Sequence, residues 1–122
     1  MATKRQRYAK RRRKRMARAD NDLSAAEWEA LLDAWNGCAY CGAKDVAFQK
    51  DCVLALSRGG RYTLDNIVPS CRSCNASKCN DEVTSWMRRK QLDEERFLVR
   101  HYEISRHLVE RFADSTAESS NA

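Results

Sequence analysis

"CAYC" at residues 38–41 and "CRSC" at residues 71–74 decide the fold of this chain. Each segment is a Cys-x-x-Cys pair, and four thiolates from two such pairs can close a tetrahedral zinc site. The expected ligands of this structural zinc are Cys38, Cys41, Cys71 and Cys74. A reduced cluster without metal is the alternative, but the Gly and Asn residues beside the pairs favour a metal site. Because a small core is marginal alone, we expect the zinc to hold the fold together.

The charge of the chain is concentrated at one end. The 122 residues carry a net charge of +6, yet residues 1–19 hold ten Lys or Arg and no acid, which leaves 13 basic and 17 acidic residues in the rest. Such a block repels itself, so residues 1–20 are expected to form a disordered arm that binds nucleic acid by releasing counterions from phosphates. A solubilising tail is the alternative. The densest part of the arm is Lys10, Arg11, Arg12, Arg13, Lys14 and Arg15.

Several classes of protein are disfavoured by the sequence. The N-terminal charges are not followed by an apolar segment, so no signal peptide is expected. No run of about 18 apolar residues is present, and no membrane partner is expected. Paired cysteines in an intracellular chain indicate metal ligands and not disulfides. We therefore expect a cytoplasmic protein of a bacterial or phage-infected host cell.

Local sequence patterns predict a core with few strands, flanked by helices. Ser24 and Glu27 form a capping box at the start of a helix that Asn36-Gly37 ends. The apolar segment 46–56 suits a strand, a turn follows at 57–60, and then a second short strand or an extended loop. Pro69 is expected to break the chain before the second cysteine pair, and a helix should run from Cys74 to about Cys79.

The C-terminal third is predicted to be helical. Residues 81–90 suggest a short helix and residues 93 to about 112 a longer one. The expected organisation is therefore a basic arm (1–20), a zinc-bound core with its preceding helix (21–80), C-terminal helices (81–113) and a disordered tail (114–122).

The segment between and behind the cysteine pairs carries a recognisable order of residues. "DCVLALSRGG" occupies 51–60, Asn66 follows, and the second pair runs into Asn75 and Lys78. Residues 38–78 thereby resemble the HNH endonuclease family, in the phage and actinobacterial subgroup with a four-cysteine zinc site. The matching residues are Cys38, Cys41, Asp51, Ser57, Gly59, Gly60, Asn66, Cys71, Cys74, Asn75 and Lys78. The resemblance implies an α+β, mostly helical fold, with a small zinc-stabilised ββα-metal (His-Me finger) core flanked by N- and C-terminal helices.

The resemblance also implies a reaction, the hydrolysis of DNA phosphodiester bonds with Mg²⁺ or Mn²⁺. The implied catalytic residues are Asp51, Cys52, Asn66 and Asn75. Asp51 and Asn75 would hold the divalent cation, whose preference for oxygen ligands suits a carboxylate and an amide. Asn66 would brace the loop and orient the general base.

Further residues are candidates for supporting contacts. Cys79 lies four residues after Asn75, which on a helix gives both the same face, so it is a candidate ligand of the same cation. Arg58, Arg61 and Lys78 are candidates for phosphate contacts, and solvated surface charge is the alternative for them.

Cys52 departs from the family pattern, which has His as the general base after the acid. An imidazole pKa near 6.5 suits proton transfer at neutral pH, whereas a thiol ordinarily titrates near 8.5 and is also a soft metal ligand. Three interpretations follow. Cys52 is an inactivating replacement, natural or introduced; it is a poor but working base; or Cys52 and Cys79 trap a second zinc with Asp51 or Asn75. The first two are favoured over the third.

The sequence thus leaves three functions in competition. An HNH endonuclease is favoured, followed by a catalytically inactive, zinc-stabilised nucleic-acid-binding module, and then by a zinc-stabilised adaptor for proteins. The expected partner is DNA, with RNA still open, and phage or mobile-element proteins are further candidate partners. The target sequence, the choice between nicking and double-strand cleavage, and the oligomeric state stay open.

Overall fold

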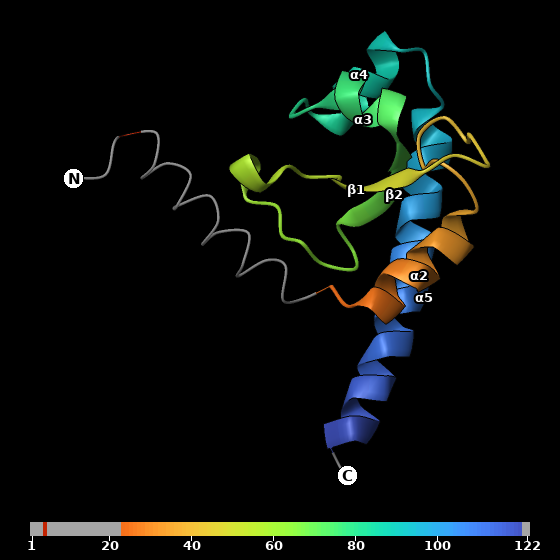
Figure 1. The fold of residues 1–122 in the computed structure, drawn as a ribbon, viewed down its shortest axis with the longest axis vertical. Helices are drawn as coiled ribbons and strands as arrows, with labels where there is room; N and C mark the ends of the chain where they lie inside the picture. The colour runs from red at the N-terminus through yellow and green to blue at the C-terminus, as the bar shows by residue number, and fades with distance from the viewer. Residues whose placement is uncertain (1–3, 5–22, 121–122) are drawn as a thin grey trace.

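The structure of the protein is a computed structural model that describes residue 4 and residues 23–120, with side chains described as far as residue 113. Figure 1 shows a small two-stranded sheet between helices, with one long helix running past it. The elements follow in the order α2 (Ala25–Trp35), β1 (Phe48–Cys52), the 3-10 helix η1 (Leu56–Arg58), β2 (Ile67–Cys71), α3 (Arg72–Lys78), α4 (Val83–Arg89) and α5 (Glu94–Ser120). The expected α+β, mostly helical class is confirmed. Apart from residue 4, the basic arm, including residues 10–15, lies outside the described residues.

Helix α2 begins and ends where the sequence predicts. The Ser24 hydroxyl accepts the backbone N–H of Glu27, and the Glu27 carboxylate accepts the backbone N–H of Ser24, which completes the capping box. Asn36 ends the helix in the left-handed region at φ 51°. The helix buries Leu31 and Trp35 against the core, so it supports the sheet from one side.

Strands β1 and β2 form an antiparallel pair in which Asp51 lies opposite Val68 and Cys52 opposite Ile67. The first strand is shorter than the predicted segment 46–56. Pro69 does not break the chain but lies within β2, opposite Lys50. Both strands of a two-stranded sheet are edge strands, and an edge strand tolerates proline, which has no backbone N–H to donate. The Pro69 carbonyl also accepts the N–H of Ala39, at 2.9 Å, which ties β2 to the first cysteine pair.

Helix α5 extends further than the sequence predicts. Its backbone is helical to Ser120, beyond the expected end near Phe112 and through most of the stretch 114–122 expected to be a disordered tail. No Gly or Pro occurs between 113 and 120, so nothing in that stretch stops a helix. Within the described part of the chain, no helix has both the length and the apolar character of a membrane span.

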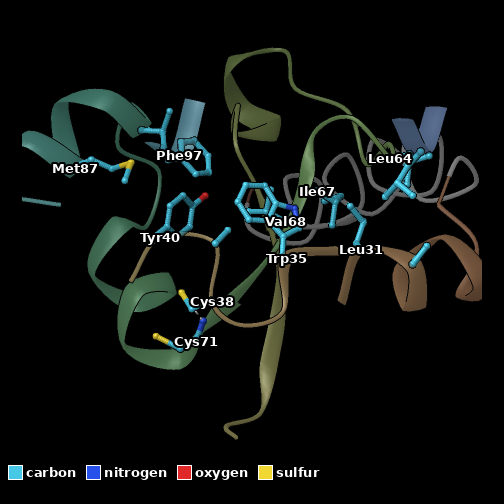
Figure 2. Packing of buried hydrophobic residues seen from close by; sticks show 14 of the residues in the cluster. Leu31, Trp35, Cys38, Tyr40, Leu64, Ile67, Val68, Cys71, Met87 and Phe97 are labelled. Atoms are coloured by element: carbon cyan, nitrogen blue, oxygen red, sulfur yellow. Dashed lines mark hydrogen bonds between the residues drawn. The ribbon is translucent and has the colours of Figure 1, made fainter. Parts of the chain in front are cut away.

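One core joins the helices to the sheet. Phe97 of α5 stacks on Trp35 of α2, with ring centroids 5.8 Å apart, and also contacts Tyr40 at 5.1 Å. Trp86 of α4 meets the Tyr40 ring edge-on at 5.1 Å. Figure 2 shows Tyr40 beside Phe97, at the end of the core nearest Cys38 and Cys71. Tyr40 therefore links the packed core to the cysteine cluster.

Candidate active site

The four paired cysteines converge on one point. Their Sγ atoms all lie within 4.8 Å of one another, and those of Cys41 and Cys71 are 3.7 Å apart. A tetrahedral site with metal–sulfur bonds of about 2.3 Å places its sulfurs about 3.8 Å apart. The cluster therefore has the ligand number, ligand type and spacing of a closed structural metal site.

Backbone groups hold the cysteines in this arrangement. The N–H of Cys38 donates to the carbonyl of Ala43, and Gly42 closes the turn by donating to Cys38, both at 2.9 Å. The N–H of Cys71 donates to the Cys38 sulfur at 3.3 Å, and that of Cys74 donates to the Cys71 sulfur at 3.4 Å. These donors aim at the sulfurs, so they suit thiolates better than thiols.

The pKa values within the cluster show what a bound cation would have to offset. Burial raises the pKa of Cys74 well above its usual range and raises that of Cys41 less. Burial alone would also raise the pKa of Cys38, but backbone hydrogen bonds from Cys41, Cys71 and Tyr40 lower it overall. A divalent cation among the sulfurs supplies the charge that keeps all four deprotonated.

Asp51 lies near the end of β1 and faces the interior, only 6% exposed. Its Oδ2 accepts the hydroxyl of Tyr40 at 2.5 Å and lies 3.2 Å from the ammonium nitrogen of Lys78. Lys78 is 1% exposed and also donates to the backbone carbonyl of Cys52 at 2.9 Å. The carboxylate is thus held by a phenol and an ammonium group.

The pKa shifts agree with this burial. Burial raises the pKa of the Asp51 carboxyl above its usual value, although the Tyr40 hydrogen bond and the Lys78 charge oppose that rise. Burial, followed by the charge of Asp51, raises the pKa of Tyr40 well above its usual value. Tyr40 therefore stays a hydrogen-bond donor, and its hydrogen bond, together with the ion pair with Lys78, favours the charged form of Asp51.

Asn75 lies on the same side of the sheet as Asp51 but has a different partner. Its amide Nδ2 donates to the side-chain oxygen of Gln49. Gln49 and Asp51 share a face of β1, and Asn75 and Lys78 are neighbours on α3. These four residues define a β1–α3 seam, in which both expected cation ligands occur.

Asn66 clamps the loop that follows β1. Its Oδ1 accepts the N–H of Leu54 at 2.8 Å, while its Nδ2 donates to the carbonyls of Leu54 and Arg61 at 3.0 and 2.8 Å. Both polar atoms of the Asn66 side chain therefore form hydrogen bonds to the backbone of the loop. The contact matches the bracing that the sequence led us to expect, whereas its role toward a base stays a proposal.

The two remaining cysteines lie apart from the four-cysteine cluster. Cys52 ends β1, is partly buried, and packs against the hydrophobic core. Cys79 is exposed and follows the last residue of α3 with φ 50°. The N–H of Cys79 still donates to the carbonyl of Asn75 at 3.0 Å, and the role of Cys79 as a ligand of the same cation stays a prediction.

The candidate phosphate contacts differ in exposure. Arg58 and Arg61 are exposed on the loop between the strands, and Arg58 donates to the carbonyl of Asn80 at 3.3 Å. Lys78 is instead buried, because its ammonium pairs with Asp51. In this arrangement Lys78 offers no surface charge to a phosphate.

The sequence pattern did not point to two residues of the site. Tyr40 stands inside the first cysteine pair, where it looks like spacer, and Gln49 looks like an ordinary exposed strand residue. The alternation of a strand could have found Gln49, because it lies two residues before Asp51. Tyr40 reaches Asp51 only through the tertiary fold.

The ββα-metal class of domain is defined by a β-hairpin and the helix that follows it. Here a four-cysteine site joins the two, and an acid and an amide lie on the seam between them. Residues 38–81 match the family model of the HNH endonucleases. This part of the chain is therefore similar to an HNH endonuclease domain.

A curated relative agrees with this assignment. The chain is 26% identical over 113 residues, 82% of its length, to the SPbeta prophage-derived protein YoqL of Bacillus subtilis (strain 168), which is named as an HNH endonuclease. The match covers 49% of that relative, so the chain spans about half the length of the protein it resembles. No solved structure matches the chain.

Proposed function

We propose that this protein hydrolyses phosphodiester bonds of DNA with the help of a divalent cation, at a rate limited by Cys52. The observation that carries the proposal is that the HNH match falls on the same residues, 38–81, that bring Asp51 and Asn75 to one seam beneath a loop braced by Asn66. The surrounding fold thus supplies the ligands and the rigidity that such a reaction requires.

The structural metal in this proposal is Zn²⁺. Four thiolates with no oxygen or imidazole ligand favour zinc among the common divalent ions, and a four-sulfur shell leaves no position for water. The zinc then acts on the scaffold and not on the substrate. Since Tyr40 lies within the first cysteine pair and donates to Asp51, the scaffold also fixes the carboxylate.

The catalytic cation is Mg²⁺ or Mn²⁺, held by the oxygens of Asp51 and Asn75. When bound, it stabilises negative charge on the phosphate and on the leaving oxygen. Asn75 is half-buried, and among the described residues its side chain pairs only with the exposed Gln49, so its amide can turn toward a new ligand at little cost. Asp51 is the more constrained of the two ligands.

Cys52 occupies the position of the general base. The loop after it is held by Asn66, so the backbone that carries the side chain at 52 is fixed. A thiol is a poor proton acceptor at neutral pH, and losing a positioned base costs about 10²–10⁴-fold in rate. We therefore propose a slow nuclease whose scaffold is intact.

The substrate is DNA, approached by positive charge. Arg58 and Arg61 lie on the exposed loop next to the seam, and the basic arm adds ten Lys or Arg in residues 1–19. Contacts of this kind go to phosphates and carry affinity and not sequence choice.

The test is nicking of supercoiled plasmid in Mg²⁺ or Mn²⁺ by the wild type and by Cys52→His. We expect slow nicking by the wild type and a gain of about 10²–10⁴-fold in the variant. The matched control is Cys52→His combined with Asn75→Ala, which keeps the base and removes a cation ligand, and it should lose the gain. Absence of nicking by both the wild type and Cys52→His would refute the enzymatic proposal.

A second candidate, nucleic-acid binding without cleavage, is favoured by one observation. Both oxygens of Asp51 are within reach of Lys78, in a chain that also has no His before residue 101. Salt-sensitive binding of DNA with no product in either metal, for the Cys52→His variant too, would select this function.

A further inference from the structure

The seam already contains a cation of its own. The Lys78 ammonium nitrogen lies 3.2 Å and 3.5 Å from the two oxygens of Asp51 and 2.9 Å from the carbonyl oxygen of Cys52. Two of these three oxygens belong to Asp51, the residue proposed to bind Mg²⁺ or Mn²⁺, and the third belongs to its neighbour Cys52. The ammonium thus sits in the type of oxygen environment that a small hard cation prefers.

Burial makes this contact obligatory in the metal-free state. Lys78 is 1% exposed and the side chain of Asp51 8% exposed, and a buried charge without a partner is strongly unfavourable. Tyr40 satisfies one more lone pair of the carboxylate. Neither member of the pair can leave unless another ion replaces it.

We propose that Lys78 is the resident counter-ion of the Asp51 site, and that a divalent cation binds Asp51 only by displacing the Lys78 ammonium. This inference rests on the proposed function for the identity of the cation, but it concerns residues that the structure describes. An ammonium and a divalent ion on the same carboxylate repel each other strongly, because their like charges lie a few ångströms apart in a buried site. Lys78 therefore lowers the affinity for the cation and sets the concentration at which the seam fills.

A neighbouring lysine provides the matched control. Lys50 precedes Asp51 in β1, but its ammonium lies over the ring of Trp28, 5.6 Å from the centroid, on the other face of the strand. Lys50→Gln and Lys78→Gln change the net charge equally. Only the second variant removes the ammonium from the carboxylate, and its amide can still donate to the carbonyl of Cys52.

The experiment titrates zinc-loaded full-length protein with Mn²⁺ and follows free Mn²⁺ by electron paramagnetic resonance. We expect Lys78→Gln to bind Mn²⁺ roughly tenfold more tightly than the wild type, or better, as removal of a like charge at this distance predicts. Lys50→Gln should change the affinity less than about twofold, as expected for a solvated charge. Lys78→Arg, which keeps the charge, should stay weak. Zinc content and circular dichroism verify that each variant is folded.

A measurement on the wild type covers the case in which Lys78→Gln does not fold. In protein without Mg²⁺, the side-chain ammonium of Lys78 should give a ¹H–¹⁵N nuclear magnetic resonance signal that is protected from solvent exchange. Saturating Mg²⁺ should remove or shift this signal. The proposal is overturned if that signal persists while Mg²⁺ shifts the Asp51 carboxyl resonance. It is equally overturned if folded Lys78→Gln binds Mn²⁺ no better than Lys50→Gln.

Failure of the nuclease proposal gives a different result. If no variant nicks DNA but Lys78→Gln still gains Mn²⁺ affinity, the counter-ion role of Lys78 stands and the enzymatic function falls. If DNA is nicked and the Lys78 variants bind Mn²⁺ like the wild type, the reverse holds.

Discussion

At the scale of single residues, the proposed function turns on Cys52. Two of the contacts that position this residue do not involve its side chain, because Lys78 donates to its backbone carbonyl and Asn66 clamps the loop behind it. A defective base on an intact scaffold can be repaired by one change. This is why the Cys52→His test is informative about the whole site.

Gly60 is the residue whose side chain the loop cannot accommodate. A Cβ built there would lie 1.8 Å from the carbonyl oxygen of Leu54, a backbone atom that Asn66 also binds. Gly60→Ala should therefore lower the free energy of unfolding by about 1–3 kcal/mol, toward the upper end, as forced overpacking does. Urea unfolding followed by circular dichroism measures it.

The control for this prediction lies one residue earlier. Gly59 has φ 95° and open space around its Cα, so Gly59→Ala costs only the strain of a left-handed residue, about 1–2 kcal/mol. A smaller loss for Gly60→Ala than for Gly59→Ala would contradict the close approach.

At the scale of elements, the sequence predicted what local chemistry decides. The capping box and Asn36 set the ends of α2, and both were readable from neighbouring residues. The cysteine spacing predicted the cluster, because turn geometry fixes where thiols two residues apart can point. The length of β1 and the place of Pro69 depend on how two strands pair, and a local pattern does not contain that information.

The burial of Lys78 shows the same limit within the site. Lysine is almost never fully buried, so its letter predicts a surface charge. Its burial follows from the packing of α3 on β1, which brings it to Asp51, 27 residues earlier. The pairing of Tyr40 with Asp51 is equally tertiary. The sequence thus pointed to Asp51, Asn75 and Lys78 but not to Gln49, and it did not predict which residues of the seam bind one another.

The short helix α4 depends on its N-cap, Glu82, the residue before its first turn. The Glu82 carboxylate accepts the backbone N–H of Ser85 at 2.7 Å, the hydroxyl of Thr84 at 2.8 Å and the backbone N–H of Thr84 at 3.2 Å. The hydrogen bond from the Ser85 N–H, followed by that from the Thr84 hydroxyl, lowers its pKa to about 2. Glu82→Ala should cost about 1 kcal/mol of stability at pH 7, the usual loss for a helix cap. Chemical denaturation measures it, with the exposed Glu103→Ala as a control expected to change stability by less than about 0.5 kcal/mol.

The sign of the pH dependence follows from the lowered pKa. The folded state holds the Glu82 proton more weakly than the unfolded state, so the cap stabilises above the ordinary value of 4.5 and its contribution fades as pH falls toward about 2. The difference between wild type and Glu82→Ala should therefore be smaller at pH 4 than at pH 7. A difference that grows on acidification would contradict the assignment of this cap.

At the scale of the whole molecule, the four-cysteine cluster predicts that the fold depends on one metal. The four cysteines join the segment after α2 to the end of β2 and the start of α3, so chelation should abolish the cooperative unfolding transition. Elemental analysis should give one zinc per chain, and Cys74→Ser should lose it. Cys79→Ser is the matched control and should retain one zinc, because Cys79 is exposed and outside the cluster. Two zincs per chain, falling to one in Cys79→Ser, would instead support the second-zinc trap with Cys52.

The uneven charge of the whole chain gives the last prediction. Binding that releases counterions from DNA weakens linearly on a plot of log affinity against log salt, with a slope of about −0.9 per phosphate neutralised. Residues 1–19 carry ten Lys or Arg, while the rest of the chain is net negative and cannot attract DNA by overall charge. If about half of the arm's charges meet phosphates, deleting residues 1–19 should reduce the slope by roughly 4–5 units.

The exposed loop provides a comparison for the change in salt slope that the arm deletion should cause. Arg58→Ala with Arg61→Ala removes two charges beside the seam, so it should reduce the slope by about 2 units at most. Fluorescence anisotropy of one labelled duplex over a range of salt concentrations compares the proteins. A deletion that leaves the slope unchanged would move the electrostatic anchor from the arm to the HNH domain, and the double substitution would then show whether the loop supplies it.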